Sequence, residues 1–322
     1  MPNFQGVWSL TTQMQNRTDW PVFVFQRALF YGGGGVAPSG SNSDTIDYIT
    51  PATLGNAADF GNMSAARIYV VGGFGSTTRG ITGGGQPTGG GYSNVIDYVT
   101  YTTLGNATDF GDFTGACAHG GSTSNQTRGI AALGLVDGLG PVNRMDYVTI
   151  ASTGNASDFG DRTAELAYFC GAVSSSTRSV FGGGYASGNS NIIDYVTIAS
   201  TGNATDFGDL TQARYGNGGV GSSTRGVFGG GYTSNVVNTM DYITIASTGN
   251  ATDFGDLTLA RHYFNGSGTN IRGIFGGGLS STARDTMDYI TIASTGNAQD
   301  FGDLSVARYG CNASCNDSGG LQ

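Results

Sequence analysis

The sequence contains no lysine and only one glutamate, Glu165. All 14 basic residues are therefore arginine, and all but one of the 23 acidic residues are aspartate. Lysine and glutamate favour helices, whereas aspartate and glycine favour turns, so this imbalance predicts strands joined by tight turns. The net charge of −9 leaves no basic stripe for a phosphate backbone, which argues against a nucleic-acid partner.

Long apolar runs are also missing. No stretch of 18 apolar residues occurs, and the first residues lack the basic start and apolar run of a signal peptide. We therefore expect a soluble protein that neither inserts into a membrane nor is exported by the classical route. The cysteines lack Cys-x-x-Cys spacing and indicate neither a zinc site nor a disulfide framework. We expect free thiols at Cys117, Cys170, Cys311 and Cys315.

The most informative feature that is present is an internal repeat. Glycine accounts for 57 of 322 residues, yet a hydrophobic content of 38% is sufficient for a packed core. A hydrophobe-Asp-Tyr triplet recurs at intervals of 50, 49, 48, 47 and 47 residues, which is the period of a four-stranded propeller blade. The triplet aspartates are Asp47, Asp97, Asp146, Asp194, Asp241 and Asp288.

The unit that begins at Ala213 shows the expected strands most clearly. Residues 213–221 and 225–231 are glycine-rich and predict the two inner strands, because glycine removes the Cβ atoms that would clash around a central channel. Residues 239–247 are β-branched and aromatic and predict the third strand, and residues 251–257 predict a short fourth strand. An open solenoid would need capping repeats, so a closed ring is favoured.

The two ends of the repeat region predict how the ring closes. Six second-strand signatures begin with the first at Arg27, but the six first-strand signatures are shifted and the last begins at residue 307. Pairing residues 307–315 beside residues 27–34 would complete the first blade and remove exposed sheet edges. The sequence thus predicts an all-β fold, a six-bladed β-propeller of four-stranded antiparallel blades, closed by the C-terminal strand pairing in the first blade.

The repeat resembles the kelch repeat over residues 27 to 315. The features that carry this resemblance are the paired glycines that end the second strand, the arginine that opens the first strand and the aromatic residue near the end of each unit. Kelch units usually have Tyr-Asp in the third strand and tryptophan in the fourth, where this chain has Asp-Tyr and phenylalanine. The resemblance therefore implies the blade, but not the partner-binding roles of kelch proteins.

A second resemblance is to tailed-phage proteins. One repeated sequence resembles those in repeat proteins of phages that infect marine and cyanobacterial hosts. It reads Asp-Tyr-Ile-Thr-Ile-Ala-Ser-Thr-Gly-Asn-Ala-Thr-Asp-Phe-Gly-Asp-Leu. The opening residues 4–15 and 19–21 are similar to the start of phage virion proteins. The resemblance implies a virion component of the tail or tail fibre that mediates subunit assembly and host-surface binding. Such a protein is made in the host cytoplasm and is extracellular once the virion is released.

Six Asp-Phe-Gly motifs also occur in the chain. Protein kinases contain this motif, but a kinase needs a nucleotide-pairing lysine, which is absent here. We expect the aspartate to accept backbone N–H groups, the phenylalanine to pack between blades and the glycine to adopt a positive φ. A second aspartate often follows, as Asp209 follows Asp206, which could suggest calcium. We favour turn capping and pairing with the recurring arginine of a neighbouring blade.

No set of catalytic residues can be assembled from the sequence. The Gly-Gly-Gly runs precede no helix and so do not predict phosphate-binding loops. His262 stands where other units have tyrosine or isoleucine, and we expect an ordinary strand residue there. With His119 as the only other histidine, no Ser/His/Asp or Cys/His arrangement emerges. We therefore expect a non-enzymatic protein without a cofactor.

Residues 1–26 are expected to form an N-terminal arm, and residues 27–322 the propeller. Both tryptophans of the chain lie in the arm, and tryptophan is enriched at binding hot spots. The arm would attach the chain to other virion proteins or to copies of itself, although an arm folded back over its own propeller stays an alternative. The candidate assembly anchors are Trp8, Trp20, Phe23 and Phe25.

The loops between the second and third strands differ in nearly every unit. Variable loops on a constant frame favour a specialised face, although drift alone also explains them. Tyr92, Tyr185 and Tyr232 lie beside these loops and are the candidate ligand-facing residues. Stacking of sugar rings on these tyrosines would make the chain a glycan-binding lectin, although Leu279 breaks the series. A self-assembling extracellular tube or sheath is a further alternative.

Overall fold

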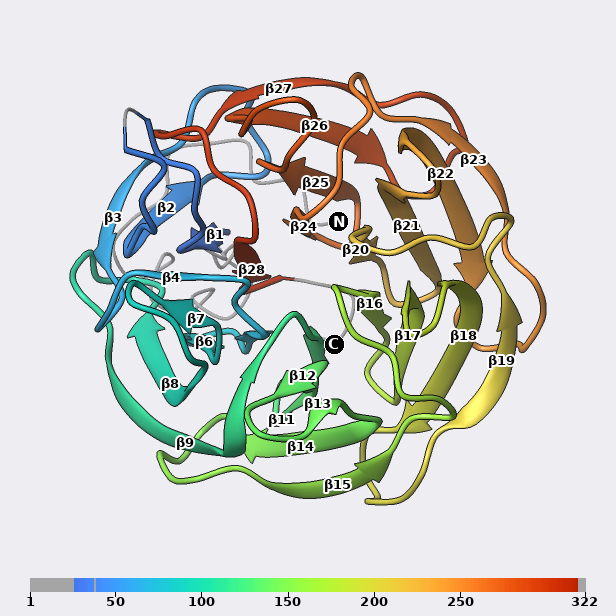
Figure 1. Cartoon of the computed structure of the whole chain (residues 1–322). Coiled ribbons are helices and arrows are strands. Elements are labelled where there is room, and N and C mark those ends of the chain that lie inside the picture. The colour runs from blue at the N-terminus through green and yellow to red at the C-terminus, as the bar shows by residue number, and fades with distance from the viewer. Residues whose placement is uncertain (1–25, 38, 318–322) are drawn as a thin grey trace, which may run out of the picture.

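The predicted six-bladed propeller is confirmed. The computed structural model describes residues 26–37 and 39–317, and within them the chain consists of strands, turns and loops. Their antiparallel sheets form six blades around a central axis (Figure 1). No helix capable of crossing a membrane is present in this part of the chain. The expected anchors Trp8, Trp20, Phe23 and Phe25 lie outside the described residues.

The first three blades are built as follows, from the axis outwards. Blade 1 contains β28 (Asn312–Cys315), β1 (Ala28–Tyr31), β2 (Thr45–Ile49) and β3 (Ala58–Asn62). Blade 2 contains β5 (Gly72–Gly75), β6 (Arg79–Gly83), β8 (Ser93–Thr100) and β9 (Thr108–Ala118). Blade 3 contains β10 (Gly121–Ser124), β11 (Arg128–Ala132), β14 (Arg144–Thr149) and β15 (Ser157–Asp161).

The remaining three blades follow the same order. Blade 4 contains β16 (Gly171–Ser174), β17 (Arg178–Tyr185), β18 (Asn189–Thr197) and β19 (Thr205–Asp209). Blade 5 contains β20 (Gly218–Gly221), β21 (Arg225–Tyr232), β22 (Val236–Thr244) and β23 (Thr252–Asp256). Blade 6 contains β24 (Asn265–Gly268), β25 (Arg272–Gly276), β26 (Thr286–Thr291) and β27 (Gln299–Asp303).

The C-terminal strand closes the ring as the sequence predicts. In blade 1, β28 pairs with β1, so that Ala28 lies opposite Cys315 and Tyr31 lies opposite Asn312. Beyond the strands, the backbone N–H of Arg27 donates to the Asn316 side chain at 2.8 Å. Strands from the two ends of the described chain therefore share one sheet, and the edge of β1 is covered.

Two faces of the disc differ in which connections they carry. We call the side with the connections between the second and third strands, and with the crossings from one blade to the next, the loop face. The opposite side carries the turns between first and second and between third and fourth strands, and we call it the turn face. Both ends of the described chain, Gln26 and Asp317, lie at the turn face and are hydrogen bonded to each other.

Blade 2 departs from four strands. Its outer strand β9 continues for 11 residues, well beyond the equivalent strands. The end of β9, at Cys117 and Ala118, pairs with β12 (Leu135–Val136) of the blade 3 loop, which in turn pairs with β13 (Gly140–Pro141). A further short ladder joins β4 (Arg67–Ile68) to β7 (Gln86–Pro87). The variable blade 3 loop thus completes an irregular sheet.

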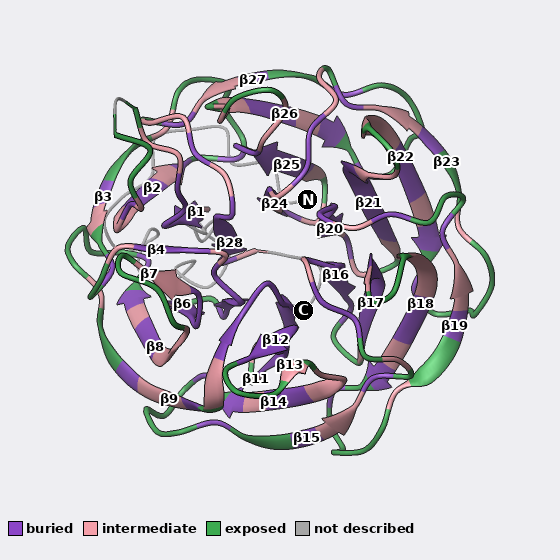
Figure 2. Cartoon of the chain, viewed as in Figure 1, coloured by how far each residue is buried: buried purple, intermediate pink, exposed green. Residues whose placement is uncertain are grey.

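The hydrophobic core lies between neighbouring blades. Phe60 of blade 1, from an Asp-Phe-Gly motif, packs in one buried cluster with Val99 and Tyr101 of blade 2, which confirms the expected role of this phenylalanine. The inner strands are almost wholly buried, whereas the outer strands alternate with exposed positions (Figure 2). A Cβ atom on Gly73 would lie 2.5 Å from the Ala313 carbonyl oxygen, so the inner strands need glycine as predicted.

An outer belt of hydrogen bonds links every blade to the next. The Gly-Asn turn between the third and fourth strands reaches the preceding blade, as Gly249 N–H donates to Phe207 O at 2.7 Å. The turn asparagine Asn250 accepts the backbone N–H of Asp209 at 3.1 Å. Equivalent asparagine bonds occur at all six boundaries, and their acceptors are Asn56, Asn106, Asn155, Asn203, Asn250 and Asn297.

The arginine that opens each second strand also spans two blades. Arg225 lies over the ring of Tyr242 in its own blade, with 4.5 Å from the guanidinium carbon to the ring centroid. Its Nη1 donates to the Ile292 carbonyl of the next blade at 3.0 Å. The guanidinium therefore stabilises the blade boundary through a cation–π contact and a charge-assisted hydrogen bond.

All four cysteines are free and buried, as expected from their spacing. Burial raises the pKa of the Cys315 thiol to about 12 and also raises that of Cys170 and Cys311, which keeps the reactive thiolate scarce. We expect no reaction of the native protein with a thiol reagent such as DTNB, and four equivalents of reaction after unfolding in urea. Rapid labelling of the native protein would contradict this burial.

Candidate functional site

A buried aspartate in each blade holds the segment that crosses from the preceding blade. In blade 5, Asp241 of the hydrophobe-Asp-Tyr triplet is fully buried and lies 2.9 Å from Nη2 of Arg214. The same carboxylate accepts the backbone N–H of Thr211 at 3.1 Å and its hydroxyl at 2.6 Å. The crossing segment is thereby fixed at two points just before it reaches the axis.

This arrangement corrects the expected partner of the recurring arginine. We predicted that it pairs with an aspartate of the Asp-Phe-Gly-Asp motif in a neighbouring blade, which is wrong. Arg308 pairs instead with Asp47 of its own blade at 3.1 Å, while Asp59 of the Asp-Phe-Gly motif is exposed. The triplet aspartate points into the sheet interior, where an unpaired carboxylate would be costly, and this explains the choice of partner.

Two blades lack an arginine at this position and replace it in different ways. In blade 4 the arginine position holds Leu166. Arg162, four residues earlier, stands where the other crossings have a hydrophobic residue, and it pairs with Asp194 at 3.0 Å. In blade 3 it holds Cys117, and Arg144 of β14 lies 3.9 Å from Asp146. Burial raises the pKa of the Asp146 carboxyl, consistent with this looser pairing. All six triplet aspartates therefore have an arginine within reach.

The crossing segments meet at the axis in a closed ring of backbone hydrogen bonds. The first strand was predicted to begin at the recurring arginine, but in blade 5 β20 begins at Gly218 and residues 214–217 lie across the loop face. Each crossing bonds to its counterparts in the neighbouring blades at 2.7–3.2 Å, through one residue in five crossings and through two adjacent residues, Tyr69 and Val70, in the sixth. Around the ring, the donor and acceptor pairs are Gly310 to Tyr263, Tyr263 to Gly216, Gly216 to Phe169, Phe169 to His119, His119 to Tyr69 and Val70 to Gly310.

Four side chains of this ring close the axis. Tyr69, His119, Phe169 and Tyr263 lie in mutual contact, with ring centroids 3.8–6.3 Å apart. All four residues have positive φ, between 54° and 63°, a conformation that costs a non-glycine residue about 1–3 kcal/mol. Such strain persists only where the surroundings enforce it, and here the hydrogen-bonded ring does so.

Further aromatic residues surround these four. Tyr215 packs edge to face against Tyr185 and in a tilted arrangement against Tyr232, with ring centroids 5.5 and 5.4 Å apart. We call the whole group the aromatic cap, and it comprises Tyr69, His119, Tyr168, Phe169, Tyr185, Tyr215, Tyr232, His262, Tyr263 and Tyr309. Burial raises the pKa of the phenols of Tyr69, Tyr215 and Tyr263, so these groups are neutral near pH 7.

The two histidines of the chain belong to the cap, so His262 is not an ordinary strand residue. Burial lowers the pKa of His119 to about 3 and that of His262 to about 4. Both imidazoles are therefore neutral in the folded protein near pH 7. Both nitrogens of His262 and Nδ1 of His119 are buried without a hydrogen-bond partner in the described part of the chain, so protonation is strongly disfavoured there.

Stability should therefore fall with acidification before the aspartates titrate. Below an unfolded pKa of about 6.5 the unfolded chain binds protons that the folded chain does not, so the free energy of unfolding decreases as pH falls. Between pH 6.5 and 5 we expect a His119→Phe/His262→Phe variant to lose less stability, by up to about 1.4 kcal/mol per pH unit for each histidine. Urea unfolding across this range measures both slopes, and equal slopes would contradict the buried neutral state.

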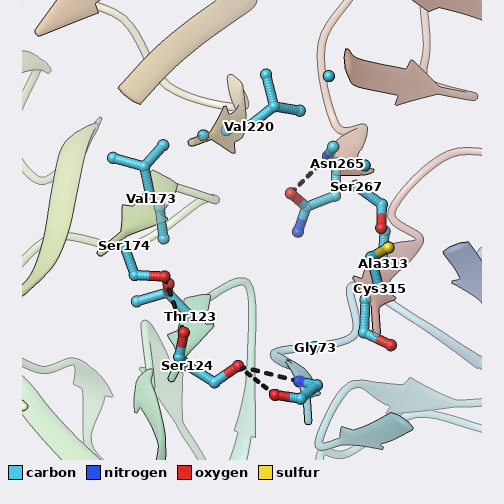
Figure 3. A pocket seen from close by; sticks show the side chains of 18 of the residues that line it. Gly73, Thr123, Ser124, Val173, Ser174, Val220, Asn265, Ser267, Ala313 and Cys315 are labelled. Atoms are coloured by element: carbon cyan, nitrogen blue, oxygen red, sulfur yellow. Dashed lines mark hydrogen bonds between the residues drawn. The ribbon is translucent and has the colours of Figure 1, made fainter. Parts of the chain in front are cut away.

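Beneath the cap, the inner strands enclose a small cavity of about 60 Å³ (Figure 3). Its walls carry small polar side chains, among them Ser124, Ser174 and Asn265. Several of these join inner strands directly, as the Ser174 hydroxyl donates to the Ser124 carbonyl at 2.9 Å. A cavity of this size and polarity suits a few water molecules and is too small for a larger ligand.

The candidate ligand-facing tyrosines are distributed unevenly. Tyr185 and Tyr232 lie in the aromatic cap, so they share one surface and do not form separate pockets in each blade. Tyr92 is half-exposed at the start of β8, where burial, followed by nearby Tyr168 and Asp137, raises the pKa of its phenol. The cap residues that follow the recurring arginine were missed in the sequence. The sequence did contain a signal for the cap, because every crossing has a tyrosine, phenylalanine or histidine one to three positions after the recurring arginine or its replacement.

The described part of the chain contains no group of three or more His, Cys, Asp or Glu side chains that could hold a metal ion. A comparison with known protein families finds no family that matches this sequence. A search of curated proteins likewise finds no matching relative.

Proposed function

We propose that this protein is a non-enzymatic assembly and adhesion protein, and that it is a component of a tailed-phage virion, in the tail or its fibres. The observation that supports this proposal best is that the two faces of the disc carry different features. The described chain ends leave together at the turn face, through Gln26 and Asp317. The loop face carries the neutral aromatic cap and the loops that differ between blades.

This arrangement suits attachment on one side and contact on the other. The residues that precede Gln26 would act as the attachment arm, with Trp8 and Trp20 as anchors to other virion proteins or further copies of the chain. The half-exposed tyrosines of the cap offer rigid, uncharged contact area, which is typical of binding surfaces. The resemblance of the repeat sequence to phage repeat proteins supports the same setting.

Mass spectrometry of purified virions from the source tests the setting directly. We expect the chain among the virion proteins, and its absence from complete particles would contradict the proposal. A chain lacking residues 1–25 tests the arm, because the closing strand β28 remains present. We expect this shorter chain to fold with unchanged thermal stability and to be missing from assembled particles. Normal incorporation of the shorter chain would contradict the role of the arm.

A further inference from the structure

The turn face carries a second set of hollows, away from the aromatic cap. Cavities of about 200, 160 and 190 Å³ lie at equivalent positions in blades 2, 3 and 6, between the third strand, the fourth strand and their turn. In blade 3 the wall includes Tyr147, Thr149, Ser152, Asn155 and Ser157. We call these hollows the rim pockets, because their strands are the outer two of each blade (Figure 1).

Each rim pocket combines a tyrosine ring with several hydroxyl groups and an asparagine amide, and the blade 6 pocket also includes Phe254 and Gln299. Tyr147 is half-buried, and Arg128 lies over its ring at 4.5 Å from the centroid. Asn155 is held by the outer belt, where its side-chain oxygen accepts the Asp112 N–H at 3.1 Å. Thr149 and Ser152 are exposed, and no charged side chain lines the three pockets.

Two exposed hydroxyl positions are constant in all six blades, although the described residues make almost no use of them. Two positions after the triplet tyrosine the residue is always threonine, and five positions after it is always serine or threonine. These residues are Thr50, Thr53, Thr100, Thr103, Thr149, Ser152, Thr197, Ser200, Thr244, Ser247, Thr291 and Ser294. Among these twelve, all exposed, only the Thr53 hydroxyl has a hydrogen-bond partner within the described part of the chain, the Thr50 carbonyl at 3.4 Å. The loops of the opposite face differ from blade to blade, so the constant serine and threonine positions are a feature of the turn face.

We propose that the rim pockets bind single neutral sugar residues. The pocket volumes match one sugar ring, the half-buried tyrosine contributes apolar surface beside the arginine that lies over its ring, and the free hydroxyls and the amide match the sugar's hydroxyl groups. Negatively charged sugars are disfavoured, because an exposed Asp-Phe-Gly aspartate, such as Asp158, follows each pocket and the chain carries a net charge of −9.

Because the pocket is repeated, several weak sites on one chain can bind the same surface at once. Rim pockets lie in blades 2, 3 and 6, so one chain offers three equivalent sites around its circumference. The residues of the blade 3 pocket also recur with little change in blades 4 and 5. Weak sites that engage one surface simultaneously bind far more tightly than any single site. Attachment near the axis of the turn face would leave this circumference accessible. The proposal adds a sugar-binding surface at the rim of the turn face to the loop-face contact surface proposed above, and it rests on the adhesion function.

The test uses the full chain with immobilised neutral glycans and with free glucose, galactose and mannose. The test variant Thr103→Gln/Ser152→Gln/Ser294→Gln fills three pockets at exposed positions. The matched control Thr88→Gln/Ser187→Gln/Ser281→Gln makes the same change at exposed loop-face positions. We expect the intact chain to bind at least one neutral sugar weakly and its immobilised form strongly. The test variant should bind the immobilised form at least tenfold more weakly, and the control should bind it as the intact chain does.

Three results would overturn the proposal. These are no binding of the intact chain to any neutral glycan, binding to anionic glycans alone, and loss of binding in the loop-face control but not in the rim variant. The virion experiment separates this proposal from the proposed function. If the chain is a virion protein but binds no neutral sugar, the rim pockets are not sugar sites while the assembly and adhesion role stands.

Discussion

Replacing Arg162 with leucine is expected to destabilise the propeller by about 3–5 kcal/mol, because Asp194 would be left buried without its charged partner. Urea unfolding monitored by far-UV circular dichroism measures the change in free energy of unfolding. A replacement of Arg284, which is half-exposed and bonds to the Ser280 hydroxyl, serves as a control and should cost less than about 1 kcal/mol.

A second substitution makes this prediction specific to the position of the charge. Blade 5 has Leu210 and Arg214 at the positions where blade 4 has Arg162 and Leu166. An Arg162→Leu/Leu166→Arg variant therefore rebuilds in blade 4 the arrangement of blade 5, and it should recover most of the lost stability. If the double variant is no more stable than Arg162→Leu alone, the two arrangements are not equivalent and our account of the crossing segment is wrong.

Removing the closing strand is the other change with a large expected effect. A chain that ends at Leu304 loses β28, exposes the edge of β1 and leaves Asp47 without Arg308. We expect this chain to aggregate or to lack cooperative unfolding, because an open sheet edge pairs with other chains. Removing only residues 318–322 retains β28 and serves as the control, which should be a stable soluble protein. Size-exclusion chromatography and thermal unfolding of both chains distinguish them, and a stable monomer without β28 would contradict closure by this strand.

The architecture was predictable because the same strand pattern recurs in six units of the sequence. The hydrophobe-Asp-Tyr spacing gave the number of blades, and the shifted arginine signatures identified residues 307–315 as the missing inner strand of blade 1. The partner of the recurring arginine was not predictable in this way. Each unit contains aspartates in two motifs, and the spacing does not reveal that Asp241 is buried whereas Asp206 is exposed.

The candidate sites were less visible than the frame. The residues that meet at the axis of the aromatic cap change identity between blades, as Tyr69, His119 and Gly216 do, so a search for constant positions passes over them. Their positive φ values depend on hydrogen bonds between crossings that are far apart in the sequence. The rim pockets have the opposite character, because their residues are constant but were assigned only to a strand and a turn.

An experimental density map of the full chain, from crystals or cryo-electron microscopy, tests the central claim most directly. We predict six blades, with residues 312–315 paired to β1 next to the axis and Arg308 in contact with Asp47. A map with five or seven blades, or with residues 312–315 away from β1, would contradict the closed ring on which both proposed surfaces depend.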